Sequence, residues 1–241
     1  ASLRAGRRKG EDSTGEEDFG GVGKKPSAER REELWNLLRE AEAAGAEYLD
    51  IDELLLPEGE YEIEKKDKFI LSRSIERAPS EGDIRWIERN AEKGILTKLV
   101  VYPRSLGDVV DLYEAAGRLS RKEEKILYAE GGLGIFSRIL FRRFGSLWMY
   151  CEEGLLEAED VSEMYRAKEI DEETYVFGIV GNPVSHSKSP QIHNLRFREG
   201  GWKAVYLPFQ VDDLDAFFRL ADMLPVKGVS VTIPHKSEVI R

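Results

Sequence analysis

Two serines, a threonine and a lysine lie in two short motifs near the end of the sequence. The first motif, GIVGNPVSHSKSPQIHN, contains Ser187 and Ser189, and the second, SVTIPHK, contains Thr232 and Lys236. The first reads as a strand, a glycine turn and a helix start, where free backbone N–H groups and the helix dipole favour an anion. The serine hydroxyls add donors that would fit a small carboxylate. A lysine at the mouth of a pocket can exchange a proton with a substrate hydroxyl.

Each motif also has a plain structural explanation. Ser189 could simply cap a helix that has Pro190 in its first turn, and Lys236 could be a surface lysine. The pair of motifs, in this order and about forty positions apart, is the stronger signal.

A third candidate for chemistry is Lys98, in the otherwise almost wholly apolar segment Ile95–Val101. A lysine within a buried parallel strand is costly and needs a reason. A desolvated amine can attack a ketone and form an imine, which would be such a reason. The alternative is a lysine at the strand end whose amine reaches solvent.

Alternating helix and strand patterns surround these residues. Helices are expected at residues 31–45, 84–93, 106–119 and 161–168, and strands at 48–51, 69–72, 95–101, 126–129 and 147–150, with a strand remnant at Leu3. This alternation predicts a parallel sheet with helical crossovers. We expect an α/β fold, a truncated (β/α)8 TIM barrel whose first strands are missing, with an open doubly wound sheet as the structural alternative.

A second run of alternation follows a charged stretch. Strands are expected at residues 175–180, 204–209 and 228–232, and helices at 191–199 and 214–223, with a further helix beginning near Pro234. The sequence thus predicts a barrel over 1–168, a linker over 169–174 and a second, partial α/β domain over 175–241. Since no initiator methionine precedes Ala1 and the sequence stops at Arg241 inside an expected helix, we expect an internal fragment of a longer protein.

The two C-terminal motifs closely resemble the substrate-binding domain of shikimate dehydrogenases over residues 175–241. The resemblance implies that Ser187, Ser189 and Thr232 hold the carboxylate and ring hydroxyls of shikimate, and that Lys236 is the catalytic acid/base. It also implies reduction of 3-dehydroshikimate with NADP, although the glycine-rich dinucleotide domain of that family has no counterpart in this sequence. Quinate or a related polyol is the alternative substrate.

Residues 3–164 resemble type I 3-dehydroquinate dehydratases, (β/α)8 barrels that dehydrate 3-dehydroquinate through a lysine Schiff base. The resemblance implies that Lys98 forms the Schiff base, that Arg138 grips the substrate carboxylate, and that Arg4 also binds the substrate. The alternative for Arg138 is a solvated helix face shared with its neighbours at 142 and 143. The two resemblances together predict an enzyme of the shikimate pathway, which leads to chorismate and the aromatic amino acids.

The barrel departs from the family pattern at three places. Ser74 stands where the family has its general acid/base histidine, and Arg8 stands where it has the glutamate that orients this histidine. Residues 156–160, LEAED, replace the family's substrate loop. A hydroxyl without a nearby base does not replace a histidine at neutral pH. The alternative function is therefore a catalytically degenerate barrel that serves as a scaffold for the dehydrogenase.

Composition excludes several classes of function. The net charge of -10 argues against a nucleic-acid partner, and no apolar run is long enough to span a membrane. A single cysteine, Cys151, allows no internal disulfide, which favours the cytoplasm. The three histidines, at 186, 193 and 235, lack the spacing of a metal site, so no metal is expected.

Overall fold

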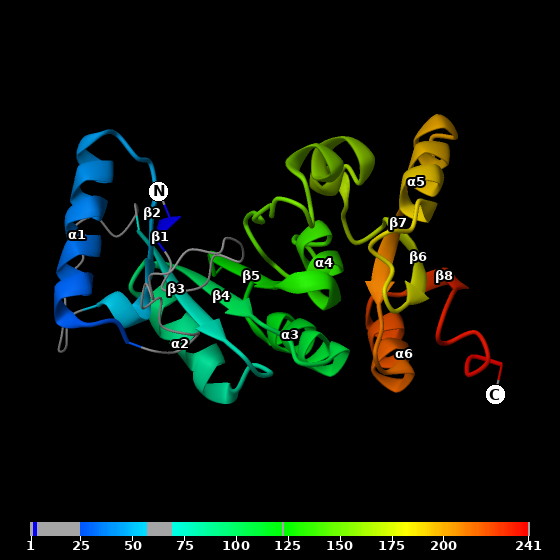
Figure 1. Ribbon diagram of the computed structural model, residues 1–241, viewed down its shortest axis with the longest axis horizontal. Helices are drawn as coiled ribbons and strands as arrows, with labels where there is room; N and C mark the ends of the chain where they lie inside the picture. Colours follow the sequence, from blue (N-terminus) through cyan, green and yellow to red (C-terminus); the bar gives the residue numbers. More distant parts are fainter. Residues whose placement is uncertain (1, 4–24, 57–68, 122, 241) are drawn as a thin grey trace, which may run out of the picture.

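Two parallel β-sheets lie side by side along the long axis of this computed structural model (Figure 1). The structure describes residues 2–3, 25–56, 69–121 and 123–240. Its first sheet has the order β1-β2-β3-β4-β5, and its second sheet has the order β7-β6-β8. Strands and helices alternate along the chain, so the predicted α/β class is confirmed.

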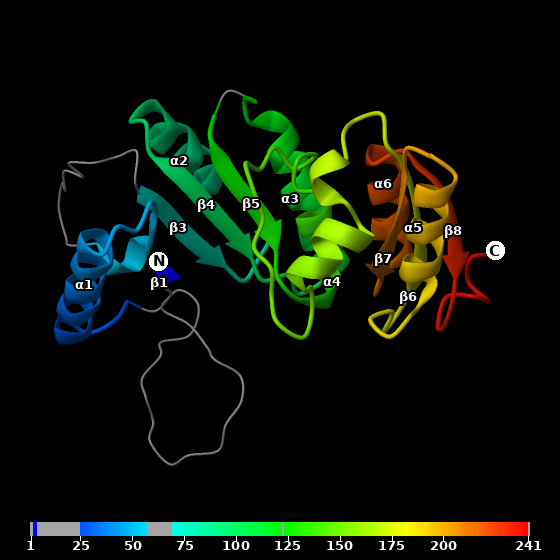
Figure 2. The same cartoon turned by 90° about the horizontal axis from the view of Figure 1, so that it is seen from above.

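The first sheet is an open arc in the described part of the chain. It consists of β1 (Ser2–Leu3), β2 (Leu49–Asp52), β3 (Phe69–Ile75), β4 (Leu96–Val101) and β5 (Lys125–Ala129), with the helices α1 (Ala28–Ala43), α2 (Glu81–Glu92), α3 (Leu106–Arg118) and α4 (Gly131–Ile139) between and after them. Every neighbouring pair of strands is parallel, as in a barrel wall. α1 lies at the end of the molecule farthest from the second sheet (Figures 1 and 2).

The second sheet follows two short helical segments, η3 (Asp160–Met164) and η4 (Ala167–Glu169). It consists of β6 (Tyr175–Gly181), β7 (Ala204–Gln210) and β8 (Val226–Val231), with α5 (Ser189–Glu199) after β6 and α6 (Leu214–Met223) after β7. β6 is the central strand and pairs in parallel with both of its neighbours. No helix in the described ranges is long and apolar enough to cross a membrane.

Three predicted elements are wrong in kind or extent. The strand predicted at 147–150 is not part of the sheet: Leu147 N donates to Lys125 O (3.0 Å), but Trp148 and Tyr150 pack their rings against the inner face of β4 and β5 instead of continuing a ladder. The helix predicted at 161–168 is broken because Arg166 adopts a left-handed conformation, with φ 51°. The helix expected after Pro234 is a series of turns over 233–240.

The sequence fixes the starts of α2 and α3 by the same local device. Ser80 and Ser105 precede the two helices, and Asp83 and Asp108, three residues later, complete a capping box at each. The apolar side of each helix then packs on the outer face of the first sheet, where Leu99 and other apolar strand residues form the main core.

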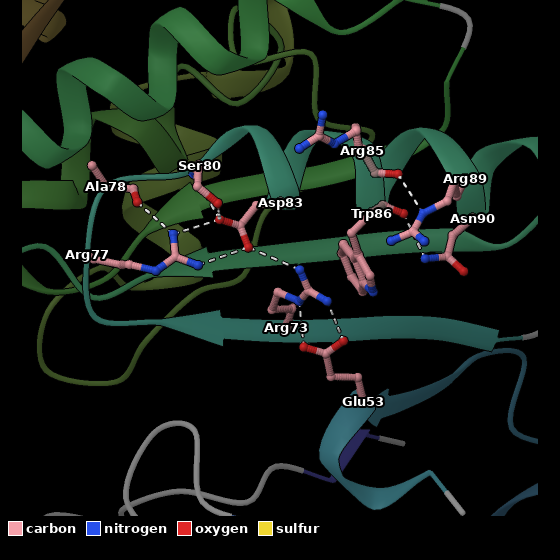
Figure 3. A network of polar contacts seen from close by, with 10 residues as sticks. All are labelled: Glu53, Arg73, Arg77, Ala78, Ser80, Asp83, Arg85, Trp86, Arg89 and Asn90. Carbon is pink, nitrogen blue, oxygen red and sulfur yellow. Dashed lines mark hydrogen bonds and ion pairs between the residues drawn. The ribbon is translucent and has the colours of Figure 1, made fainter. Parts of the chain in front are cut away.

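The buried Asp83 is also the centre of a partly exposed ionic network on this outer face (Figure 3). Its carboxylate accepts hydrogen bonds from Arg77 (2.6 Å) and Arg73 (3.0 Å), as well as from the Ser80 hydroxyl (2.6 Å). Arg73 in turn forms a two-point ion pair with Glu53 (2.5 and 2.7 Å) and lies over the Trp86 ring. Although burial opposes ionisation, these hydrogen bonds hold the pKa of Asp83 well below its usual value of 3.8.

We expect this network to lose its stabilising effect in acid. Because the pKa of Asp83 is lower in the folded state, its contribution to stability is complete above pH 3.8 and is lost as the pH falls below that value toward the folded pKa. Asp83→Asn should lower the free energy of unfolding by about 2 kcal/mol at pH 7 and should flatten its decrease at acid pH. Urea denaturation across this range measures both effects, and Asp222→Asn on the exposed side of α6 is the control. If the free energy of unfolding of Asp83→Asn fell with acid as steeply as that of the unaltered protein, the proposed role of Asp83 would be contradicted.

One hydrophobic core extends through both sheets. Phe136 of α4 lies 5.3 Å from Phe209 of β7, which lies 5.4 Å from Phe217 of α6, between ring centroids. α3 also packs on α6, and Leu106 N at the start of α3 donates to Asp212 Oδ1 (3.0 Å) after β7. The two units are therefore joined by packing as well as by the chain.

Arg143 is a second link between the units. Its buried guanidinium donates to the carbonyl oxygens of Asp171 (2.8 Å) and Thr174 (2.6 Å) in the connecting segment and to that of Leu224 (3.1 Å) after α6. A planar guanidinium suits this task because it directs several donors at once.

Arg143→Met should therefore lower the free energy of unfolding by about 2–3 kcal/mol, since it leaves buried carbonyl groups without donors. The neighbouring Arg142 is exposed, so Arg142→Met is a matched control that should change stability by about 0.5 kcal/mol or less. Chemical denaturation of both variants checks the prediction, and equal effects would refute it.

Candidate functional site

Lys98 lies on the inner face of the first sheet, in the middle of β4. Side chains alternate between faces along a strand, so Lys98 shares its face with Ser72 of β3, which pairs with it in register, and with Asp50 of β2. The Lys98 side chain is 0% exposed, its Nζ forms an ion pair with Asp50 Oδ2, and the Ser72 hydroxyl donates to Asp50 Oδ1. Tyr150 OH donates to Asp50 Oδ2 (3.1 Å).

The alternative of a lysine whose amine reaches solvent is therefore wrong. Lys98 is buried and paired, and its Nζ lies 4.6 Å from the centre of the Tyr150 ring. The ring and the carboxylate restrict the amine to one region of the inner face. Ser74 lies two residues after Ser72 on the same face and is partly exposed. An amine, a carboxylate and hydroxyl groups are thus available at this face for imine chemistry on a ketone.

A second carboxylate, Asp52, ends β2 close by. It accepts a hydrogen bond from Leu54 N (2.9 Å), but burial outweighs this and raises the pKa of Asp52 above 3.8, helped by the charges of Glu53 and Asp50. Asp52 is therefore costly to ionise in the folded chain, whereas Asp50 has the amine of Lys98 as its counter-ion.

Arg138 is buried in α4, next to the same inner face. Its guanidinium lies 5.0 Å from the centre of the Tyr128 ring and pairs with Glu130 and Glu152. The alternative of a solvated helix face is wrong for Arg138 and also for Arg143; only Arg142 among the three is exposed. Arg4 and Arg8, the two other barrel positions singled out from the sequence, lie outside the described residues.

The two C-terminal motifs meet at the carboxyl ends of β6 and β8. Thr232 N donates to Val180 O (2.8 Å), and Asn182 N donates to Ile233 O (3.0 Å). Gly181 is needed at this crossing, since a Cβ there would lie 2.3 Å from Thr232 Cγ2. The segment that carries Thr232 and Lys236 therefore lies directly against the turn that leads to Ser187.

The serine motif leads from β6 into the first turns of α5. The helix begins at Ser189 itself, with Pro190 in the first turn, so Ser189 is not the capping residue that the sequence suggested. The Ser187 hydroxyl instead accepts a hydrogen bond from Ser189 N (3.2 Å). A cavity of about 260 Å³ is lined by Ser187 and by residues of the first unit such as Tyr165, but by neither Thr232 nor Lys236.

His235 fixes the segment before Lys236. Its buried ring hydrogen-bonds to Val211 O (2.8 Å) through Nε2 and to the Glu238 carboxylate (3.0 Å) through Nδ1. Glu238, and then the Val211 carbonyl, raise the pKa of His235 above 6.5, because both favour the doubly protonated ring. Lys236 itself is exposed at the surface.

By fold, the chain is an α/β protein with two units, each built on a parallel sheet. The first sheet has Lys98 on its inner face, and in the second unit Ser187 and Ser189 lie at the start of α5. The family model described as type I 3-dehydroquinase matches residues 21–175, and that of the shikimate dehydrogenase substrate binding domain matches residues 179–241. The chain therefore belongs to the type I 3-dehydroquinase family. A shikimate dehydrogenase substrate-binding domain follows the dehydroquinase region, as the sequence predicted.

Several known proteins are similar to all or part of this chain. The bifunctional 3-dehydroquinate dehydratase/shikimate dehydrogenase of Arabidopsis thaliana, named as chloroplastic, is 30% identical over 224 residues, which are 86% of this chain and 36% of that protein. The shikimate dehydrogenase (NADP(+)) of Pyrococcus furiosus is 47% identical over 73 residues, 30% of this chain and 27% of that protein. The solved dehydroquinate dehydratase and shikimate dehydrogenase from S. pombe AroM has a TM-score of 0.40 at 22% identity, covering 89% of this chain and 43% of that one. The chain spans about a third of the length of the Arabidopsis relative and about a quarter of that of the Pyrococcus relative.

Sequence reasoning missed three residues around the barrel site. Glu130 and Glu152 hold Arg138, and Tyr150 contacts both Asp50 and Lys98. Only Glu130 carried a signal, since it directly follows β5 at the carboxyl edge where sites of parallel sheets form. Tyr150 lies in the segment 147–150, which was predicted as a strand, and Glu152 follows that segment without a pattern of its own.

Proposed function

We propose that the protein catalyses consecutive steps of the shikimate pathway: dehydration of 3-dehydroquinate in the barrel and NADP-dependent reduction of 3-dehydroshikimate to shikimate. The observation that carries the second step is the crossing of the two motifs at Gly181, which holds the Thr232 segment against the turn to Ser187. NADP is the cofactor of the whole protein in this proposal, as the names of the relatives suggest.

In the second unit, Ser187, Ser189 and Thr232 would bind the carboxylate and hydroxyls of the substrate, and Lys236 would exchange the proton of the reacting oxygen. Hydroxyl donors beside the start of α5 suit a carboxylate, because the first turn of a helix offers free N–H groups. Shikimate is the proposed ligand, and quinate is the alternative within the same chemistry.

Calorimetry with shikimate on the whole protein tests this proposal. Ser187→Ala should weaken shikimate binding by roughly 10- to 150-fold, since a hydrogen bond to a charged group is worth about 1.5–3 kcal/mol. Ser162→Ala, which alters an exposed serine of η3, is the control and should bind shikimate normally. Binding that is equally strong in both variants would remove Ser187 from the site, and no binding in the unaltered protein would refute the assignment.

In the barrel, the Lys98 amine would attack the ketone of 3-dehydroquinate, and the resulting carbinolamine would lose water to form an imine. Asp50, which contacts Nζ, is placed to take the proton that the ammonium must lose. The imine acidifies the neighbouring C–H, and a base removes that proton and returns a proton to the departing hydroxyl, which leaves as water. Hydrolysis of the remaining imine consumes one water and releases the enone from Lys98. Arg138 and Arg4 are the proposed substrate-binding residues of this step.

A second candidate function is a barrel that no longer dehydrates and instead stabilises the dehydrogenase. It is favoured by Ser74 at the position of the family's histidine, because loss of a general base typically costs about 10²- to 10⁴-fold in rate. The continuous core from Phe136 to Phe217 fits such a supporting role.

Borohydride trapping with 3-dehydroquinate separates the two candidates. Hydride reduces the imine to a stable amine, so an adduct on the Lys98 peptide without turnover would support the degenerate barrel. Turnover at rates typical of the family would support the dehydratase, and no adduct with no turnover would exclude both imine chemistry and dehydration at Lys98.

The boundaries that we propose for the two domains are 1–168 and 175–241, joined by residues 169–174. The cytoplasm is the proposed compartment, and its basis is the single, exposed Cys151. The proposed ligands are small molecules, and the acidic net charge of -10 argues against nucleic acid.

A further inference from the structure

One guanidinium nitrogen of Arg138 forms ion pairs with two carboxylates of the same chain. Its NH2 pairs with Glu130 Oε2 and with Glu152 Oε2 (2.9 Å). The Arg138 side chain is 2% exposed, that of Glu130 13% and that of Glu152 45%. Within the described residues, one guanidinium thus faces two carboxylates, and that of Glu152 is the more exposed of the two.

The guanidinium nevertheless keeps a free donor. Arg138 Nε is buried and has no hydrogen-bond partner in the part of the chain that the structure describes. Buried N–H groups are nearly always paired, so this donor marks a place where a ligand oxygen could bind.

Arg138 is connected to Lys98 by two aromatic rings. It lies over Tyr128, whose ring stacks on Tyr150 at 5.8 Å, and Tyr150 lies beneath the Lys98 amine. Arg138 and the Lys98 amine are therefore linked on the inner face by an unbroken series of ring contacts.

We propose that Glu130 and Glu152 are specificity-determining residues that occupy Arg138 in place of a ligand carboxylate, so that the barrel excludes carboxylate ligands unless Glu152 moves away. This inference rests on the proposed role of Arg138 as the carboxylate-binding residue of the barrel. An incoming carboxylate would be the third negative group around one guanidinium, in a buried site where like charges repel strongly. Glu152 is the residue that a ligand would displace, since nearly half of its side chain is in solvent.

Quinate is a suitable probe because it has the ring and carboxylate of the proposed substrate but no ketone to react with Lys98. Its affinity for the full protein is measured by calorimetry in Glu152→Gln, in Glu130→Gln/Glu152→Gln, and in the control Glu153→Gln/Glu163→Gln, which removes two exposed carboxylates. Any quinate bound by the second unit contributes equally to all of these proteins.

The expected result is a new or at least tenfold tighter quinate site in Glu130→Gln/Glu152→Gln, a smaller gain in Glu152→Gln, and no gain in the control. Adding Arg138→Leu to the double variant should abolish the gain. Equal affinity in all proteins, or a gain that survives Arg138→Leu, would overturn the inference. If circular dichroism shows that the double variant does not fold, Glu152→Gln, which alters a half-exposed side chain, decides by the same criterion.

Trapping with 3-dehydroquinate and borohydride distinguishes this inference from the proposed function. A quinate site that appears without any adduct on Lys98 would leave the inference standing and refute imine chemistry in the barrel. An adduct on Lys98 that forms equally in the unaltered protein and in Glu130→Gln/Glu152→Gln would support the chemistry and refute the inference.

Discussion

Lys98→Met should lower the free energy of unfolding by about 3–5 kcal/mol at pH 7, the usual effect of removing one partner of a buried ion pair. The substitution keeps a long apolar stem in β4 but leaves the Asp50 carboxylate buried without its counter-ion. Ser72 and Tyr150 would still donate to Asp50, but two hydroxyl groups do not replace an ammonium. Urea denaturation followed by circular dichroism measures the change.

The matched control is the double variant Asp50→Leu/Lys98→Met. Replacing both members of a buried pair by apolar residues is often neutral or even stabilising, so the double variant should be more stable than Lys98→Met alone. A double-mutant cycle then gives the coupling between the two residues. A double variant less stable than both single variants would show that the pair is not the main electrostatic element of the inner face.

The same pair shows what the sequence could and could not predict. The apolar surroundings of Lys98 predicted correctly that it lies in a parallel strand, because a strand covered on both faces has an apolar sequence, but they left open whether its amine is buried or reaches solvent. They gave no partner, since Asp50 lies 48 positions earlier and meets Lys98 only through the register of β2, β3 and β4. Pairing between strands is a property of the fold, and local patterns do not contain it.

Elements with a clear period were predicted well. α6 has the predicted bounds, 214–223, because its apolar residues recur at helical spacing and Asp213 caps its start. The segment 147–150 was predicted as a strand from its aromatic and apolar residues, which in the structure cover the inner face as side chains rather than pair as backbone. Composition alone does not separate these two uses of an apolar segment.

The sequence analysis singled out basic residues of the candidate site but missed its acidic residues. Lys98 was singled out because a lysine in an apolar strand is conspicuous, and Arg138 and Lys236 because the resemblance to the two families implies their roles. Glu130 and Glu152 were missed because this chain contains 46 acidic residues, and nothing local distinguishes a glutamate that neutralises a buried arginine from one on a solvated surface.

Lys236→Ala should lower kcat of the whole protein for reduction of 3-dehydroshikimate by about 10²- to 10⁴-fold, the usual contribution of a general acid or base. KM should change little if Lys236 acts mainly in the transition state, because such an interaction contributes to kcat rather than to ground-state binding. Initial rates at saturating NADPH measure both constants. Lys227→Ala, another exposed lysine of the second unit, is the control and should keep the full kcat.

The position of Lys236 makes this effect separable from a loss of stability. Lys236 is exposed, so Lys236→Ala should change the free energy of unfolding by about 0.5 kcal/mol or less. His235, its neighbour, is the buried anchor of the segment, and its raised pKa means that its contribution to stability is complete below pH 6.5 and is lost as the pH rises through the folded pKa. A rate loss in Lys236→Ala that is accompanied by lower stability, or that is reproduced by Lys227→Ala, would point to packing. A rate loss with unchanged unfolding and unchanged KM would identify Lys236 as the proton-transfer group, because those two controls leave only the chemical step.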